Sequence, residues 1–143
     1  MSGTSAQLRT LSFWLHCVIL LAACAPMVSR AHEFRQGDVV MDHPYATPSL
    51  GGTTTGAVYF KAIRNKGKVP DRLMSARTTV AARVEIHHMH LDGQIMRMRQ
   101  VPAFEFPALA EVSLRHGGAG SYHLMLLELS KPLKDGDRFD LEL

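Results

Sequence analysis

Two histidines and two methionines in the second half of this 143-residue chain have the chemistry of a soft metal site. Thioether sulfur selects Cu(I) among the biological metals, and imidazole nitrogen also suits that ion. Such a set needs no thiol. If the four side chains converge in the fold, the protein binds copper; they are His87, Met98, His123 and Met125.

A predicted hairpin would bring the first two of these side chains together. Asp92-Gly93 is a strong two-residue turn signal, because the centre of such a turn needs positive φ. Folding the chain about this dipeptide pairs His87 directly with Met98, and paired residues on one face have Cβ atoms roughly 4.5–5.5 Å apart. A slip of one residue would instead move His88 onto the ligand face.

The remaining candidates follow from strand alternation. His123 and Met125 are two residues apart, so both point the same way on a strand. Met89 and Met96 would lie on the His87 face, nearer the turn. They either pack under the hairpin or form a secondary thioether pair that helps copper to enter or leave.

Residues 1–31 are predicted to be an export signal rather than part of the fold. Arg9 precedes an apolar stretch that is shorter than the roughly 20 residues of a membrane span. Cleavage after Ala31 would leave a mature domain of residues 32–143. The alternative is a lipoprotein signal in which Cys24 becomes the lipidated N-terminus and anchors the protein to a membrane.

Cysteine usage and charge exclude several classes of protein. Cys17 and Cys24 both lie in the predicted signal, so a disulfide framework and a blue-copper centre with a thiolate ligand are excluded for the mature domain. Residues 32–143 carry 14 basic and 13 acidic side chains, which offers no basic face for nucleic acid. No nucleophile triad, carboxylate pair or phosphate loop indicates an enzyme.

Short runs of β-branched and aromatic residues, divided by frequent turn signals, predict an all-β sandwich or barrel. Alternation turns His87, His123 and Met125 away from the main core, as a surface metal site requires. A helix over residues 80–83 is too short to stand alone. The expected strands are Gln36–Met41, Thr53–Ile63, Arg72–Ala76, Ala82–Leu91, Gln94–Gln100, Glu111–Arg115, Ser121–Leu129 and Arg138–Leu143. The expected inward residues are Val58, Phe60, Leu73, Ala76, Val84, Ile86, Val112, Leu114, Leu124 and Leu126.

The spacing of the four candidate ligands resembles that of the PCuAC family of periplasmic copper chaperones. The family motif is a His, ten residues, a Met, about twenty-one residues and then His-x-Met. Ten residues separate His87 from Met98, and twenty-four separate Met98 from His123, so this chain is three residues longer than the motif. The excess is expected in the glycine-rich stretch Gly117–Ser121, which tolerates insertion at small entropic cost. The resemblance covers residues 33–143 and includes Asp42–Tyr45, Gly56–Phe60, Asp71–Leu73 and Lys131–Asp137.

This resemblance implies a cupredoxin-like, Ig-like Greek-key β-sandwich that binds Cu(I) and is not an enzyme. It implies a periplasmic, monomeric carrier that delivers copper by ligand exchange. The acceptor would be the CuA centre of cytochrome c oxidase subunit II or an intermediate copper carrier. Family members usually continue past the segment equivalent to Asp140–Leu143 with a further strand, so the sheet is expected to lack an edge strand.

Two other functions are compatible with the residues. A buffer or sensor for Cu(II) or Zn(II) could use His87, His88, His90 and His123, since imidazole binds both ions. In that reading His88 and His90 form a His-x-His pair; otherwise they are solvated hairpin residues. A structural or adhesive lipoprotein would use the methionines for packing alone.

Overall fold

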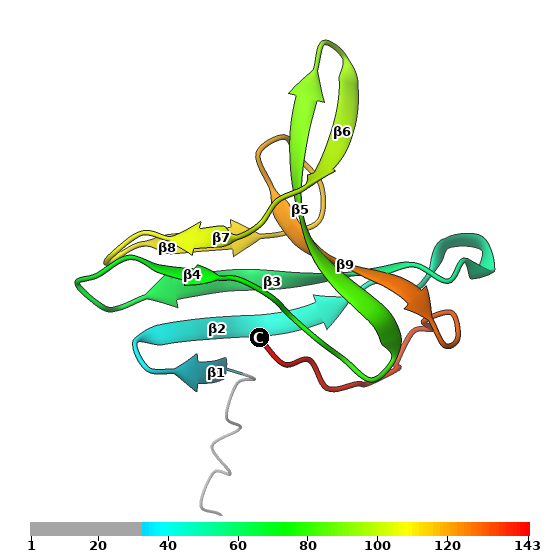
Figure 1. The fold of residues 1–143 in the computed structure, drawn as a ribbon, viewed down its shortest axis with the longest axis horizontal. Coiled ribbons are helices and arrows are strands. Elements are labelled where there is room, and N and C mark those ends of the chain that lie inside the picture. The colour runs from blue at the N-terminus through cyan, green and yellow to red at the C-terminus, as the bar shows by residue number, and fades with distance from the viewer. Residues whose placement is uncertain (1–32) are drawn as a thin grey trace, which may run out of the picture. The chain divides into compact units, whose positions relative to one another are not determined.

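The computed structural model describes residues 33–143, which form an antiparallel, all-β fold (Figure 1). The predicted signal, residues 1–31 with both cysteines, lies outside the described residues. Within residues 33–143, no helix is long and apolar enough to cross a bilayer. The elements are β1 (Glu33–Gln36), β2 (Val39–Ala46), a 3-10 turn η1 (Leu50–Gly52), β3 (Gly56–Asn65), β4 (Asp71–Leu73), β5 (Ala81–Asp92), β6 (Ile95–Gln100), β7 (Phe104–Phe106), β8 (Glu111–Leu114) and β9 (Tyr122–Leu129).

Seven of these strands form one sheet in the order β1-β2-β3-β9-β5-β6, with β8 also paired to β3. Strand β3 is shared along its length. Its first residues, Gly56 to Val58, pair with β9, and its later residues, Phe60 to Arg64, pair with β8. Strands β4 and β7 form a separate two-stranded sheet. The hairpin of β5 and β6 rises away from the rest of the large sheet in Figure 1.

One hydrophobic cluster joins the two sheets. Leu73, Phe104 and Phe106 from β4 and β7 belong to the same buried cluster as residues from the large sheet. The expected inward residues are confirmed, because each is buried in this cluster or packs against it. The cluster members from the rest of the chain are Val39, Val58, Phe60, Ile63, Ile86, Leu114, Leu124, Leu126, Leu129 and Leu133.

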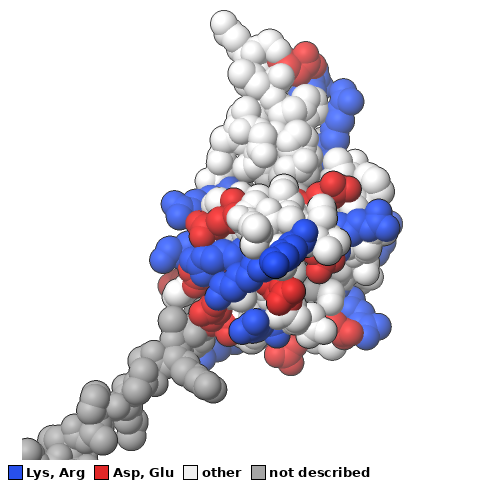
Figure 2. Space-filling view, turned by 90° about the vertical axis from the view of Figure 1, so that its left-hand side faces the viewer, with Lys and Arg blue, Asp and Glu red and all other residues white. Residues whose placement is uncertain are grey.

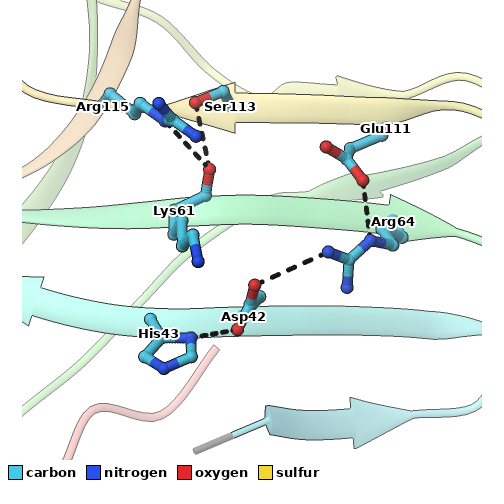
Figure 3. Close-up of polar contacts among 7 residues, drawn as sticks. All are labelled: Asp42, His43, Lys61, Arg64, Glu111, Ser113 and Arg115. Atoms are coloured by element: carbon cyan, nitrogen blue, oxygen red, sulfur yellow. Dashed lines mark hydrogen bonds and ion pairs between the residues drawn. The ribbon is translucent and has the colours of Figure 1, made fainter.

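The pairing of β3 with β8 is irregular at one point, where side chains of β8 and of the residue after it bind a backbone carbonyl of β3. The register between β3 and β8 shifts between Phe60 and Ile63. The carbonyl oxygen of Lys61, within this shift, accepts hydrogen bonds from Ser113 Oγ at 3.1 Å and Arg115 Nε at 3.4 Å (Figure 3). These exposed contacts tie β3 to β8 where the register shifts.

Farther along β3, one guanidinium links three strands. Arg64 Nε lies 2.7 Å from Glu111 Oε2 on β8, and Arg64 Nη2 lies 3.5 Å from Asp42 Oδ2 on β2 (Figure 3). Asp42 also binds the ring of His43. That hydrogen bond, aided by nearby cations including Arg64 and opposed by desolvation, holds the pKa of Asp42 below its usual value.

A buried amide fixes the turn between β3 and β4. Asn65 Nδ2 donates to the carbonyl oxygens of Val69 at 2.8 Å and Phe106 at 3.1 Å. Asn65 Oδ1 accepts from the Gly67 amide at 2.9 Å. Both ends of the amide are therefore satisfied, and the turn is tied to β7 as well as to itself.

Two predicted strands differ from those observed. The predicted strand Gln36–Met41 is divided because Gly37 has φ of +56° and forms a tight turn between β1 and β2. The predicted strand Arg138–Leu143 is wrong. Only Glu142 makes an isolated antiparallel pair, with Arg77, because no regular strand lies opposite the rest of that segment among the described residues.

Two short segments, residues 80–83 and strand β7, also differ from the expectation. The considered helix over residues 80–83 is instead where β5 begins. Strand β7, Phe104–Phe106, was not predicted, although its alternating Phe-Glu-Phe sequence carries a strand signal.

Candidate metal centre

Two of the predicted ligands face each other across a strand pair. His87 on β5 lies directly opposite His123 on β9, and their ring centroids are 5.6 Å apart. One step along the same face, Glu85 lies opposite Met125. Alternation on both strands therefore gathers two imidazoles, one thioether and one carboxylate on the face away from the hydrophobic cluster.

This face is not simply a surface at His123. His123 is only 2% exposed, because the rings of Tyr59 on β3 and of His87 lie against its ring at centroid distances of 5.8 Å and 5.6 Å. The expectation of a surface site is therefore wrong at His123, which turns away from the core but is covered by aromatic rings.

Two imidazole nitrogens here are buried and have no hydrogen-bond partner among the described residues. They are Nδ1 of His87 and Nδ1 of His123. Burial, then the nearby His87 and His116, lowers the pKa of His123 to about 4. The His123 ring is consequently neutral at neutral pH, which is the form that binds a metal ion. Unpartnered buried nitrogens of this kind fit a site that takes a metal.

His116, in the bend that follows β8, also borders this centre. Its ring meets Tyr59 edge-on at a centroid distance of 5.2 Å, and its backbone amide donates to the hydroxyl of Tyr45 at 3.3 Å. Tyr45 in turn stacks on Tyr59 at 5.4 Å. The sequence signal that could have found it is a histidine at the start of the glycine-rich stretch that precedes His123.

The hairpin register differs from the predicted one by two residues. His87 pairs with Gln100, and Met98 pairs with Met89. The reason is that the central turn residues are Gly93 and Gln94 rather than Asp92 and Gly93. Gly93 has φ of +63°, and a glycine in the first central position is what a type II′ turn requires.

A shift of two residues preserves the face of each side chain. Met98 therefore still shares the face of His87, as its diagonal neighbour instead of its direct partner. Met89 and Met96 are on this face too. Met98 is 56% exposed, and in Figure 2 the projecting hairpin carries few charged side chains. The Met98 thioether is therefore open to solvent, whereas Met125 is half-buried.

The two remaining histidines of the hairpin point the other way. His88 and His90 alternate with His87, and the ring of His88 lies 4.4 Å from that of Tyr122. The set of His87, His88, His90 and His123 considered for a divalent ion therefore does not converge. Within residues 33–143, no group of three or more His, Cys, Asp or Glu side chains is arranged to hold a metal ion.

The end of the glycine-rich stretch continues the strand pairing beside β5. The amide of Met89 donates to the carbonyl of Ser121 at 2.8 Å, and the amide of Gly120 donates to the carbonyl of Met89 at 2.7 Å. His123 keeps its direct pairing with His87 beyond this loop. The glycine-rich stretch, where the three extra residues are expected, therefore leaves the pairing of His123 with His87 intact.

Solved PCuAC domains share this fold. The copper-bound PCuAC domain from PmoF2 is 24% identical, with a TM-score of 0.62, over 77% of this chain and 83% of that chain. The apo PCuAC domain from PmoF1 is 21% identical, with a TM-score of 0.61, over 77% of this chain and 84% of that chain. The prediction of a cupredoxin-like, all-β sandwich is confirmed.

The amino-acid sequence itself matches a protein family, the LpqE-like family. Residues 39–143 match the LpqE-like family, described as "Putative lipoprotein LpqE-like". The chain belongs to the LpqE-like family. No curated protein matched it.

Proposed function

We propose that this protein is an exported Cu(I) carrier that binds the ion with His87, His123, Met98 and Met125. The observation that carries the proposal is the His87–His123 pair, with its two buried, unpartnered Nδ1 atoms beside Met125. Copper here is cargo, and the only chemistry is exchange of ligands. The likeness to a copper-bound PCuAC domain supports the same assignment.

The two kinds of ligand have different accessibility, and this difference suits transfer. The imidazole of His123 is enclosed, whereas the side chain of Met98 is exposed on the hairpin. An acceptor's ligand can therefore replace a thioether first while the imidazoles still hold the ion. Neutral thioether and imidazole donors favour Cu(I), and Cu(II) is a second ion that the imidazoles would accept.

The proposed location is the periplasm, with Cys24 lipidation as the membrane-anchored alternative. The lipoprotein description of the family supports export. The proposed acceptor is cytochrome c oxidase subunit II, at its CuA centre, or an intermediate copper carrier. Incubating the Cu(I)-loaded protein anaerobically with a purified CuA domain tests delivery. Copper moving to that domain supports this acceptor, and copper remaining on the carrier argues against it.

Metal binding itself is tested by anaerobic Cu(I) titration against a chromophoric chelator, with copper-edge X-ray absorption on the product. We expect one Cu(I) per chain with both sulfur and nitrogen scatterers. Replacing both Met98 and Met125 by Leu keeps side-chain volume and should abolish this binding. The matched control is Met74→Leu, since Met74 is also exposed but lies outside the site.

Other results would overturn the assignment. Cu(I) bound with the same affinity by the double-leucine variant would exclude the thioether ligands. An all-nitrogen shell would favour a divalent-metal buffer. An absence of any Cu(I) uptake by the unchanged protein would exclude the Cu(I) role and leave the divalent-metal buffer and the structural role of the sandwich as the remaining interpretations.

A further inference from the structure

Glu85 contacts one of the proposed ligands on the side away from the unpartnered nitrogen. It lies two residues before His87 on β5, so the two side chains share a face. Glu85 Oε2 is 2.9 Å from His87 Nε2. The two side chains are 22% and 16% exposed, so this contact is shielded from most of the solvent.

Glu85 has no second ion-pair partner among the described residues. Within residues 33–143, His87 is the only cationic or potentially cationic side chain within ion-pair distance of Glu85. Glu85 also lies opposite Met125, which places its carboxylate beside a second proposed ligand. A half-buried carboxylate is stabilised when it accepts a hydrogen bond, and the His87 ring provides it.

This contact determines which nitrogen of His87 is free. A neutral imidazole has one N–H group and one lone pair. When Nε2–H donates to the carboxylate, the lone pair is on Nδ1, the atom that is buried without a partner. His123 presents its own Nδ1 in the same unpartnered condition, directly across the strand pair.

We propose that Glu85 is a positioning residue for copper: its carboxylate holds His87 with Nδ1 directed to the metal and balances the charge of the bound ion. The inference rests on the proposed function. Carboxylates that accept from the second nitrogen of a metal-binding histidine fix its tautomer and raise its basicity, and their loss typically lowers metal affinity about 10–100-fold. Four neutral ligands leave the positive charge of Cu(I) uncompensated, and Glu85 lies where it can offset it.

Three variants test this role. Glu85→Ala removes the acceptor, Glu85→Gln keeps an acceptor oxygen but removes the charge, and Glu111→Ala removes a carboxylate that binds Arg64 on another part of the sheet. The first measurement is the ¹⁵N spectrum of His87 in the metal-free protein, which reports the nitrogen that carries hydrogen. The second is Cu(I) affinity by chelator competition.

We expect the unchanged protein to show the Nε2–H tautomer of His87. Glu85→Ala should lose this preference and bind Cu(I) about 10–100-fold more weakly. Glu85→Gln should keep the tautomer and recover part of the affinity, and the shortfall measures the effect of charge. Glu111→Ala should match the unchanged protein in both measurements.

The proposal is overturned if Glu85→Ala keeps both the tautomer and the affinity, or if Glu111→Ala weakens binding as much. If Glu85→Ala does not fold, Glu85→Gln decides: its affinity must fall with the His87 tautomer preserved. A failure of the proposed function looks different, because the unchanged protein would then bind no Cu(I). That result removes the copper role of Glu85 as well.

Discussion

The rings of His87 and His123 lie 5.6 Å apart, and His87 is one of the groups that lower the pKa of His123. Burial is the larger cause. The folded protein thus holds His123 neutral down to about pH 4, whereas the unfolded chain protonates it near the ordinary value of 6.5. This difference links the stability of the metal-free protein to pH.

The sign of that link is a loss of stability in acid. Between pH 6.5 and about 4, His123 is protonated in the unfolded chain but neutral in the folded protein. The free energy of unfolding therefore falls as the pH is lowered through this range. The contribution of this group is at most about 3 kcal/mol. Urea denaturation at several pH values should show a steeper decline for the unchanged protein than for His123→Gln. Parallel curves would contradict the prediction.

Tyr59 should control how deeply His123 is shielded. Its ring lies 5.8 Å from that of His123, and burial is the main cause of the lowered pKa of that histidine. Tyr59→Ala is expected to raise the pKa of His123 toward its ordinary value, and Tyr59→Phe to leave it low. An NMR titration of the His123 ring in the metal-free protein measures both. Equal values in the two variants would show that Tyr59 is not the shield.

Gly93 should determine whether the hairpin presents Met98 correctly. Its φ of +63° is a conformation in which residues other than Gly, Asn and Asp are strained by roughly 1–2 kcal/mol. Gly93→Val is therefore expected to destabilise the hairpin and weaken Cu(I) binding, whereas Gln94→Ala, at the other central position of the turn, should be tolerated. Hydrogen exchange at Met89 and Met98 reports the hairpin, and chelator competition reports the affinity. Unchanged exchange in Gly93→Val would refute the turn assignment.

Asn65 should matter for stability and not for the metal. Its amide makes three hydrogen bonds, to Val69, Phe106 and Gly67, in a buried position. Asn65→Ala is expected to lower the free energy of unfolding by roughly 2–3 kcal/mol, because it leaves buried backbone groups unpartnered. Lys66→Ala, at the exposed neighbouring position, is the control and should change little. Urea denaturation of both variants decides, and the Cu(I) affinity of folded Asn65→Ala should equal that of the unchanged protein.

Alternation was the part of the fold and of the site that could be predicted from sequence. The faces of His87, Met98, His123 and Met125 follow from a period of two, which survives an error of two residues in register. That is why the hairpin was predicted with the wrong partners and still with the right face. The turn itself could not be placed, because Asp-Gly is compatible with glycine in either central position.

Contacts between strands that are distant along the chain could not be predicted from the sequence. The covering of His123 by Tyr59 depends on β9 lying between β3 and β5, and no local pattern reports that order. The contact of His116 with Tyr59 has the same origin. The 2.9 Å contact of Glu85 with His87 depends on side-chain geometry, which strand alternation does not determine.

Met89 marks a boundary within the β5–β6 hairpin, because it pairs with Met98 on one side and with Gly120 and Ser121 on the other. From His87 to Met89, β5 is paired on two sides, with β6 and with the chain from Gly120 onward. Beyond Met89, the two strands of the hairpin pair only with each other, among the described residues, as far as the turn. Met98, opposite Met89, lies at this boundary, whereas His87 and His123 pair with each other across β5 and β9. Bending of the hairpin beyond Met89 would therefore change the position of Met98 relative to His87 and His123, the other proposed ligands.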